Sequence, residues 1–502
     1  MDEEVKSQIE KQRNIFSSTT NYLLLATALF IAVAFRLYGL NRFSLWADEL
    51  WGVMACSKGS WMAMMQDLVA NDNHPPGYQT ILYFVMKWFG DGETIIRMPS
   101  IIAGIATVYM VYHIGKKLLS LETGALAAFI VACSYQSIFY SQEARAYALL
   151  VFFCLWNTYY FLKLFIVEHT TNKNILLFTA TGAGCVFLHY AGLLFIICQL
   201  FLLIPIIVFS KNKKVILTSA ACAYGILALL YLKWIPVMIV QIHHDEFYWE
   251  ETPTLSAVFG TIRYLLGPDD IRLVMYASAI ILAVCASGNA IYRYRDRDNR
   301  EPKIVLAIFF LVVVPLALSF IKSSISASIY TNRYFIFTIP LLSLLAGYGI
   351  ASAIKWVDSD RLKQSALIAS VIFICATGLL LDRNLYIESL GKQDFRGAVK
   401  IVAEDNDFLS KSGTVIASHE FFDYYLKKFN VAEHAQGYLL FPGQLPQTFR
   451  KINTLGKKTF YYLEVAPMEQ TPINQQLYAR YHRISYQRVM EINVIKYEVT
   501  EE

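Results

Sequence analysis

Long apolar runs repeat along most of the chain, and short charged loops separate them. Each run has about 16–26 residues, and a helix needs about 20 to cross the hydrocarbon core of a bilayer. Hydrophobic residues make up 56% of the 502 residues and charged residues only 17%. The sequence therefore predicts an α-helical multi-span membrane protein with about 11 transmembrane helices. The predicted spans are residues 22–38, 98–115, 123–140, 146–165, 175–190, 191–209, 215–240, 273–292, 304–321, 334–354 and 365–381.

One further apolar stretch, residues 78–89, is too short to span. It has about 12 residues and carries Lys87, so we expect it to lie in the membrane interface or to re-enter the same face. The first span follows a polar segment, and no small-residue cleavage site comes after it. We therefore expect an uncleaved signal anchor.

Loop charges divide between the two sides of the membrane if residues 78–89 do not cross it. One side then collects most of the lysines and arginines, and the other collects most of the loop carboxylates. Because positively charged loops stay in the cytoplasm, we expect the N-terminus inside and the C-terminus outside. The basic cluster at residues 293–300 is then a short cytosolic loop, and we expect no nucleic-acid partner.

The composition changes from about Asp382 onward. Charged residues now interrupt shorter apolar patches, as a soluble domain requires. Residues 414–417 and 459–463 predict strands, and residues 395–404 and 421–429 predict amphipathic helices. We therefore expect a transmembrane domain over residues 1–381 and a soluble α/β domain over residues 382–502 on the outer face. Eight cysteines are present, but their positions predict neither a disulfide framework nor a cysteine metal site.

Charged residues next to the predicted spans are the candidates for function, because charge beside lipid is costly. Asp48 and Glu49 lie among aromatic residues in the first outer loop. A carboxylate there suits a general base that deprotonates a hydroxyl, and a solvated loop pair is the alternative. Glu143 and Arg145 lie between two spans with almost no loop to solvate them. An exposed ion pair would contribute less than about 1 kcal/mol, so we favour a functional role for Glu143.

Several donors on the same predicted face suit an anionic ligand. Arg333 begins a span, and arginine forms bidentate bonds with phosphate; a snorkelling anchor is the alternative. His74 precedes two prolines and Tyr78, and it either contacts phosphate or caps a turn. His189 and Tyr190 end a span, where a lone histidine is more often structural.

Taken together, these residues resemble the family 39-type C-fold glycosyltransferases. That group includes the dolichyl-phosphate-mannose protein mannosyltransferases and the bacterial aminoarabinose lipid A transferase. The likeness covers nearly the whole chain and is clearest over residues 41–200. The residues that carry it, in order, are Leu45-Trp46-Ala47-Asp48-Glu49, His74-Pro75-Pro76-Gly77-Tyr78, Phe89-Gly90-Asp91-Gly92-Glu93 with Arg97, Tyr140-Ser141-Gln142-Glu143-Ala144-Arg145-Ala146-Tyr147, His189-Tyr190, Asn332-Arg333-Tyr334-Phe335 and Asp394-Phe395-Arg396-Gly397-Ala398.

The resemblance implies transfer of a sugar from a polyprenyl-phosphate donor to a cell-surface lipid, glycan or protein, with inversion at the anomeric carbon. It implies a multi-pass protein of a bacterial inner membrane whose reaction takes place on the outer face, without an obligate metal or cofactor. The roles that it implies are general base for Asp48, with Glu49 beside it, placement of acceptor or sugar by Glu143, donor phosphate binding by His74, Arg145 and Arg333, and substrate contact by Tyr78, His189 and Tyr190.

Two other classes of protein stay open at this point. A lipid or solute transporter would show repeated halves or spans broken by glycine and proline at matching positions, and neither pattern is present. A ligase or polymerase that uses a diphosphate-linked glycan would place basic residues in a large central outer loop, and residues 246–270 are acidic instead. The donor that is turned over distinguishes the three classes.

We predict that a topology reporter fused after Leu381 or at Glu502 reports an extracytoplasmic position, because the basic residues gather in the other set of loops. Paired cytoplasmic and periplasmic reporters measure this directly. A signal from the cytoplasmic reporter alone would contradict this topology, because the predicted outer loops would then lie in the cytoplasm.

Overall fold

The computed structural model describes residues 18–242, 251–267, 269–294, 300–381, 392–410, 413–439, 444, 446–447, 450, 459–466 and 471–499. The chain forms two compact units. The first contains Met1–Tyr38, Gly59–Gly90 and Ile95–Asn384. The second joins the short segments Gly39–Lys58 and Asp91–Thr94 to Leu385–Glu502. Three basic residues that precede the first predicted span, Lys6, Lys11 and Arg13, lie outside the described residues. The expected domain boundary at residues 381–382 lies at their edge, because residue 381 is described and residue 382 is not.

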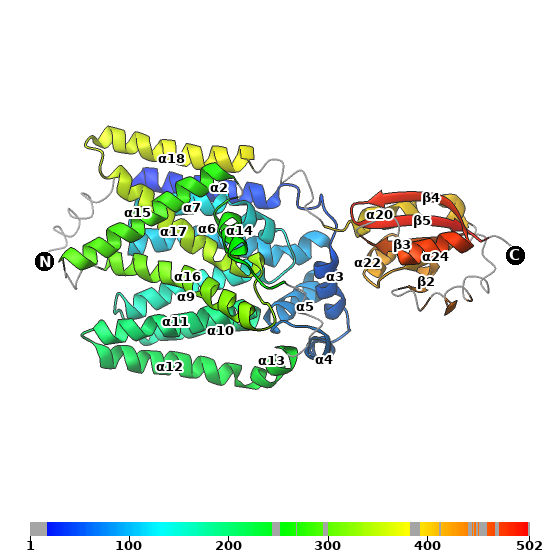
Figure 1. Ribbon diagram of the computed structural model, residues 1–502, viewed down its shortest axis with the longest axis horizontal. Helices are drawn as coiled ribbons and strands as arrows, with labels where there is room; N and C mark the ends of the chain where they lie inside the picture. Colours follow the sequence, from blue (N-terminus) through cyan, green and yellow to red (C-terminus); the bar gives the residue numbers. More distant parts are fainter. Residues whose placement is uncertain are drawn as a thin grey trace. The chain divides into compact units, whose positions relative to one another are not determined.

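The first unit is helical in its described residues (Figure 1). Its longer helices pack side by side. The elements are α2 (Ser18–Leu37), α4 (Trp61–Asn71), α5 (Gly77–Phe89), α6 (Glu93–Leu118, whose first two residues belong to the second unit), α7 (Leu121–Ala132), α8 (Tyr135–Ser141), α9 (Tyr147–Phe165), α10 (Asn172–Leu188), α11 (Tyr190–Phe209), α12 (Lys213–Tyr231), η1 (Leu232–Trp234), α13 (Ile235–Ile242), α14 (Leu255–Leu266), α15 (Asp270–Tyr294), α16 (Glu301–Ile325), η3 (Asn332–Thr338), α17 (Ile339–Ile354) and α18 (Asp360–Leu381).

Among the described residues, eight helices are long and apolar enough to cross a membrane. The count is nine if α7 and α8, which meet at a bend of 60°, form one broken span. The chain is therefore a multi-span membrane protein, but the expected number of about 11 is only partly supported. The two predicted spans without a match among these candidates correspond to α10, which has 17 residues, and α18, which begins at Asp360. Helix α5 has 13 residues, as expected for a segment too short to cross.

Helix α7 is buried along its whole length. Small residues let its neighbours approach closely, as in other helix interfaces within membranes. A Cβ atom added to Gly115 of α6 would lie 2.4 Å from the Cα of Gly124, and one added to Gly347 of α17 would lie 2.9 Å from the carbonyl oxygen of Thr123. These close approaches pack α6 and α17 against α7. Helix α8 and the turn after it follow α7 in the chain.

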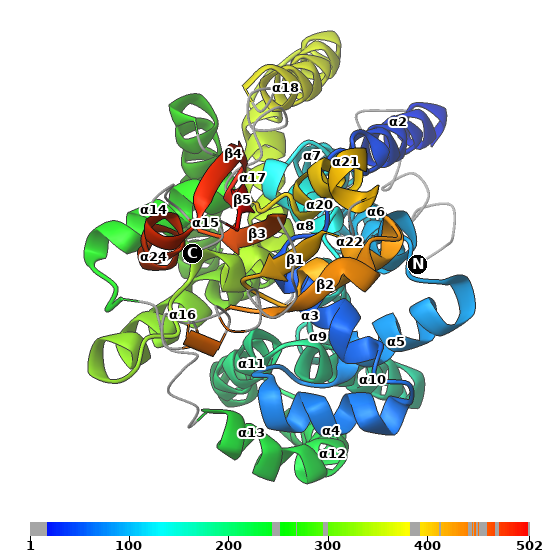
Figure 2. The ribbon, with the colours of Figure 1, turned by 90° about the vertical axis from the view of Figure 1, so that its right-hand side faces the viewer.

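The second unit contains a five-stranded sheet of order β2-β1-β3-β5-β4 (Figure 2). Strand β1 is parallel to β2 and β3, and β5 is antiparallel to β3 and β4. Side chains alternate between the two faces, so Phe460 and Tyr462 pack with Leu477 of α24. Tyr461 points to the opposite face and packs on Phe408. The elements are α3 (Ala47–Cys56), α20 (Phe395–Ala403), α21 (Asn406–Ser410), β1 (Thr414–Ala417), α22 (Phe422–Lys428), η4 (Ala432–His434), β2 (Ala435–Tyr438), β3 (Thr459–Val465), α24 (Pro472–Arg480), β4 (His482–Val489) and β5 (Ile492–Glu498).

The predicted strands and helices of the C-terminal region match β1, β3, α20 and α22. The sequence did not indicate α24, β4 or β5, because polar or charged residues interrupt the apolar positions there. It also did not indicate that the segment Gly39–Lys58, with α3, joins this unit. The division into residues 1–381 and 382–502 stays a prediction.

Candidate active site

The loop between α4 and α5 is held against the end of α10. Pro75 and Pro76 restrict the backbone before α5 begins at Gly77. A Cβ atom at Gly77 would lie 2.5 Å from the carbonyl oxygen of Phe187, so only glycine permits this approach. The close packing brings His74 within ring contact of His189, which follows α10 in the chain. The centroids of the two imidazole rings are 5.2 Å apart.

Asp72 is a buried carboxylate that organises this loop. One of its oxygens accepts a bond from Nδ1 of His74 at 2.7 Å, and the other accepts a bond from Nε2 of Gln79 at 3.1 Å. Burial alone would raise the pKa of Asp72, but the charges of His74 and Arg145 and the bond from His74 outweigh it and lower the pKa. Asp72 is therefore a carboxylate that fixes the orientation of His74. The sequence analysis did not single out Asp72.

His189 lies at the centre of a group of rings. Its Nδ1 accepts a bond from the backbone N–H of Ala191 at 3.0 Å, so a neutral His189 carries its proton on Nε2. Nε2 is buried and has no hydrogen-bond partner among the described residues. The ring centroids of His74, Tyr147 and Tyr334 lie 5.2, 5.6 and 4.8 Å from that of His189. The arrangement leaves one N–H donor that a ligand could satisfy.

The turn between α8 and α9 carries Glu143 and Arg145, and both are buried. The carbonyl oxygen of Arg145 accepts a bond from the hydroxyl of Ser100 at 3.2 Å, which ties the turn to α6. The hydroxyls of Tyr140 and Tyr264 lie 2.6 Å apart, and the charge of Glu143 acts on both. This short turn thus holds a carboxyl group and a guanidinium group inside the helical unit.

Arg333 lies in η3, close to these groups. Its charge acts on His189 and Tyr264, and its guanidinium carbon lies 5.8 Å from the ring centroid of Tyr334. The side chain of Asn332 accepts a bond from the hydroxyl of Thr261 at 2.6 Å, which fixes η3 against α14. The first unit therefore brings His74, Glu143, Arg145, His189 and Arg333 into one cluster, which we call the polar cluster.

Two residues that the sequence analysis did not propose hold the turn of the polar cluster in place. Arg36 of α2 is fully buried and donates to the carbonyl oxygens of Val131 and Ala132, at the C-terminal end of α7. Gln142 in turn donates to the carbonyl oxygen of Tyr38, at the C-terminal end of α2. Each side chain thus donates to carbonyl groups at a helix end, where backbone partners are few. The sequence did contain a signal for Arg36, because an arginine within an apolar span is costly and therefore a candidate for a role.

Two predicted substrate-contact residues have partners within the protein. The hydroxyl of Tyr190 donates to Gln241 and accepts a bond from Nε1 of Trp234 at 3.3 Å, which ties α11 to α13. Tyr78, in the first turn of α5, is buried. Their contact with a substrate stays a proposal.

Asp48 and Glu49 belong to the second unit, at the start of α3. Glu49 is fully buried, and its carboxylate accepts a bond from the backbone N–H of Trp46 at 3.3 Å. Asp48 is partly exposed. The two neighbouring carboxylates therefore differ, because Glu49 caps the helix whereas Asp48 keeps contact with solvent. The role of either carboxylate in proton transfer stays a proposal.

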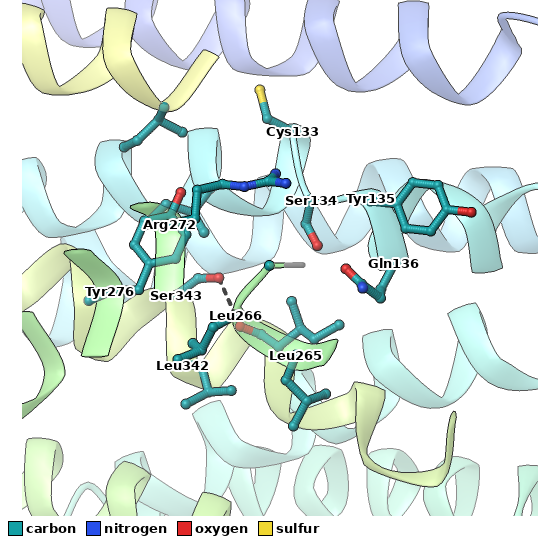
Figure 3. Close-up of a pocket in the computed structure, with 15 residues that line it drawn as sticks. Cys133, Ser134, Tyr135, Gln136, Leu265, Leu266, Arg272, Tyr276, Leu342 and Ser343 are labelled. Carbon is teal, nitrogen blue, oxygen red and sulfur yellow. Dashed lines mark hydrogen bonds between the residues drawn. The ribbon is translucent and has the colours of Figure 1, made fainter. Parts of the chain in front are cut away.

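The first unit also contains a small pocket at the break between α7 and α8. Its lining is both apolar and polar, and Figure 3 shows the polar side chains of Ser134, Gln136 and Arg272 among the lining residues. None of the predicted site residues lines it. Among the described residues, no three His, Cys, Asp or Glu side chains are grouped so as to hold a metal ion.

Residues 73–239 match the family described as dolichyl-phosphate-mannose-protein mannosyltransferase. The fold is similar to that of ArnT from Cupriavidus metallidurans bound to undecaprenyl phosphate, with 11% identity and a TM-score of 0.61, over 96% of this chain and 98% of that chain. It is also similar to an archaeal oligosaccharyltransferase, AglB from Archaeoglobus fulgidus, in complex with an inhibitory peptide and a dolichol-phosphate. There the identity is 12% and the TM-score 0.53, over 95% of this chain and 74% of that chain. No curated protein sequence matches. The predicted resemblance to C-fold glycosyltransferases is confirmed.

We predict that Asp72→Ala lowers the free energy of unfolding by about 3–5 kcal/mol, because it leaves His74 and Gln79 without their acceptor. Thermal unfolding in detergent measures the change. Because the pKa of Asp72 is lowered, this stabilisation is present above its usual pKa and is lost as the pH falls through the lowered value.

A matched control is Asp67→Ala on α4, since the hydrogen bond of Asp67 to Asn71 is exposed to solvent. We expect it to change the free energy of unfolding by no more than about 0.5 kcal/mol. Equal effects of the two substitutions would contradict a special role for Asp72.

Proposed function

We propose that the chain is an integral membrane glycosyltransferase that moves a sugar from a polyprenyl-phosphate donor to a cell-surface acceptor. The polar cluster is the observation that carries this proposal. It gathers two arginines, two histidines and one glutamate at the ends of apolar helices, where charge is costly unless it serves a ligand or a partner. Much of it lies in the region that matches the mannosyltransferase family.

The donor phosphate is the ligand that the cations suit. Arg145 and Arg333 supply planar guanidinium groups, which bind phosphate through two parallel N–H bonds. His74 has its Nδ1 occupied by Asp72, so its other ring nitrogen is oriented by that bond and serves the phosphate. His189 donates to the phosphate from Nε2, and Tyr78 and Tyr190 contact the substrate. The polyprenyl chain then lies among the apolar helices.

The transfer is a single displacement in this proposal. The hydroxyl of the acceptor attacks the anomeric carbon, its proton passes to the carboxylate of Asp48, and the bond to the phosphate oxygen breaks. The polyprenyl phosphate leaves as a monoester, whose charge the arginines offset. Inversion follows from attack opposite the leaving group. Glu143 places the sugar or the acceptor, Glu49 supports Asp48 by capping α3, and no metal or cofactor takes part.

The reaction site is on the extracytoplasmic face of a bacterial inner membrane, with the N-terminus in the cytoplasm and the C-terminal unit outside. The charge distribution of the loops supports this orientation. The sugar is a hexose or a pentose, and the acceptor is a surface lipid, glycan or protein.

We predict that Asp48→Asn lowers the rate of transfer by roughly 100- to 10,000-fold, as loss of a general base does. The amide keeps the shape of the side chain and loses its basicity. Sugar transfer in membranes with equal amounts of the two proteins measures the effect. Glu433→Gln is the matched control, because Glu433 belongs to the same unit and is exposed.

An Asp48→Asn variant that keeps nearly full activity would exclude Asp48 as the base. In that case Glu49→Gln tests whether its neighbour takes the role.

We predict that Arg333→Lys weakens donor use by roughly 10- to 150-fold, since lysine cannot form the second of two charge-assisted bonds. Saturation curves with a polyprenyl-phosphate sugar measure the effect. Arg263→Lys on α14 is the control, because Arg263 pairs with Asp270 at the surface. Superimposed curves for Arg333→Lys and the unmodified protein would make Arg333 a membrane anchor instead.

A further inference from the structure

Arg396, in the first turn of α20, binds two separate segments of the second unit. Its guanidinium donates to both carboxylate oxygens of Glu93, at 3.0 and 3.2 Å. It also donates to the carbonyl oxygens of Asn41 and Arg42, at 2.8 and 3.0 Å. One side chain thus joins α20 to the segment Asp91–Thr94 and to the loop that precedes α3.

Further contacts fix the same loop between Arg42 and α3. The backbone N–H of Leu45 donates to the hydroxyl of Tyr425 on α22 at 2.8 Å. The hydroxyl of Ser44 donates to the backbone carbonyl of Gln393 at 3.2 Å, and the backbone N–H of Ala47 donates to the side chain of Gln393 at 3.4 Å. Backbone groups are thus held on both sides of Trp46, directly before Asp48.

Helix α3 itself packs on the C-terminal part of the unit. The rings of Trp51 and Phe421 meet edge to face with centroids 6.4 Å apart. Phe421 in turn contacts Phe395, the residue before Arg396, with centroids 6.0 Å apart. The turn that carries Asp48 is therefore fixed by polar contacts at its start and by aromatic packing one turn later.

A second ion pair in this unit provides a contrast. Lys428 and Asp91 are 2.7 Å apart, and their side chains are 44% and 47% exposed. Arg396 and Glu93 are 29% and 16% exposed, and Arg396 also donates to the loop before α3. Exposed pairs contribute little, whereas a half-buried guanidinium with four bonds restricts its partners strongly. The two pairs should therefore respond differently to substitution.

We propose that Arg396 is a positioning residue for Asp48, and that the C-terminal part of the second unit serves as the platform for the catalytic loop. This inference rests on the proposed function of Asp48 as the base. Arg396 does not touch the reacting atoms. It holds the backbone of the loop, so that the first turn of α3 presents the Asp48 carboxylate in one place.

The loss of this contact should affect the rate rather than donor affinity. A displacement of about 1 Å at a reacting group costs up to roughly 100-fold in rate. We therefore expect Arg396→Gln to lower kcat by roughly 10- to 100-fold while the KM for the donor stays unchanged. Arg396→Lys keeps the charge but cannot reproduce the fork of guanidinium donors that reaches both segments. Its kcat should therefore lie between those of Arg396→Gln and the unmodified protein.

Backbone hydrogen exchange of the full-length protein in detergent tests the platform without any need for activity. In Arg396→Gln, we expect the amides of residues 44–51 to exchange at least about tenfold faster than in the unmodified protein. The control Lys428→Gln should leave both exchange and kcat as they were. Melting temperatures of all variants show that each protein is folded, and Arg396→Lys replaces Arg396→Gln should the latter not fold.

Unchanged exchange in residues 44–51 would overturn the proposal, and so would faster exchange with an unchanged kcat. A fall of equal size in Lys428→Gln would also overturn it, because the effect would then not be specific to the loop. Failure of the proposed function has a separate signature. In that case Asp48→Asn keeps its activity, whereas the exchange of residues 44–51 still responds to Arg396.

Discussion

The cost of placing charge among apolar helices governs the structure of the first unit. A buried ion loses hydration worth several kcal/mol, so each one needs partners or a ligand. Asp72 meets this requirement with His74 and Gln79. Arg36 meets it with the carbonyl groups at the C-terminal end of α7. The Nε2–H of a neutral His189 is a different case, since it is uncharged but buried without a hydrogen-bond partner among the described residues, and we propose that a ligand binds there.

In the second unit, the notable contacts are those between the C-terminal part and the short loop that precedes α3. Helix α3 is brief, and its cap comes from Glu49 rather than from a serine or an aspartate. The helix gains support from aromatic side chains and from the bonds of Arg396. The C-terminal residues and the segment Gly39–Lys58 therefore form one compact unit, although about 340 residues separate them in the chain.

Much of this architecture could be predicted from the sequence, because apolar length and charge asymmetry are local signals. The strand at residues 414–417 and the short helix at residues 78–89 also followed from local pattern. The roles of Arg36, Gln142 and Arg396 could not be predicted in the same way. Their partners lie about 100 or 350 residues away, and only the folded chain shows which carbonyl groups they reach. The expected number of about 11 spans is supported only in part, since eight or nine candidate spans are present among the described residues.

The central claim is that a lipid-linked monophosphate sugar is the donor. The most direct measurement gives the purified protein matched donors, a polyprenyl-monophosphate sugar and a polyprenyl-diphosphate sugar with the same sugar and chain. Membranes that lack the protein supply the acceptor, and mass spectrometry follows both lipid products. The account predicts that only the monophosphate donor is consumed, with one polyprenyl phosphate released for each sugar transferred. Consumption of the diphosphate donor alone, or of neither donor, would contradict it.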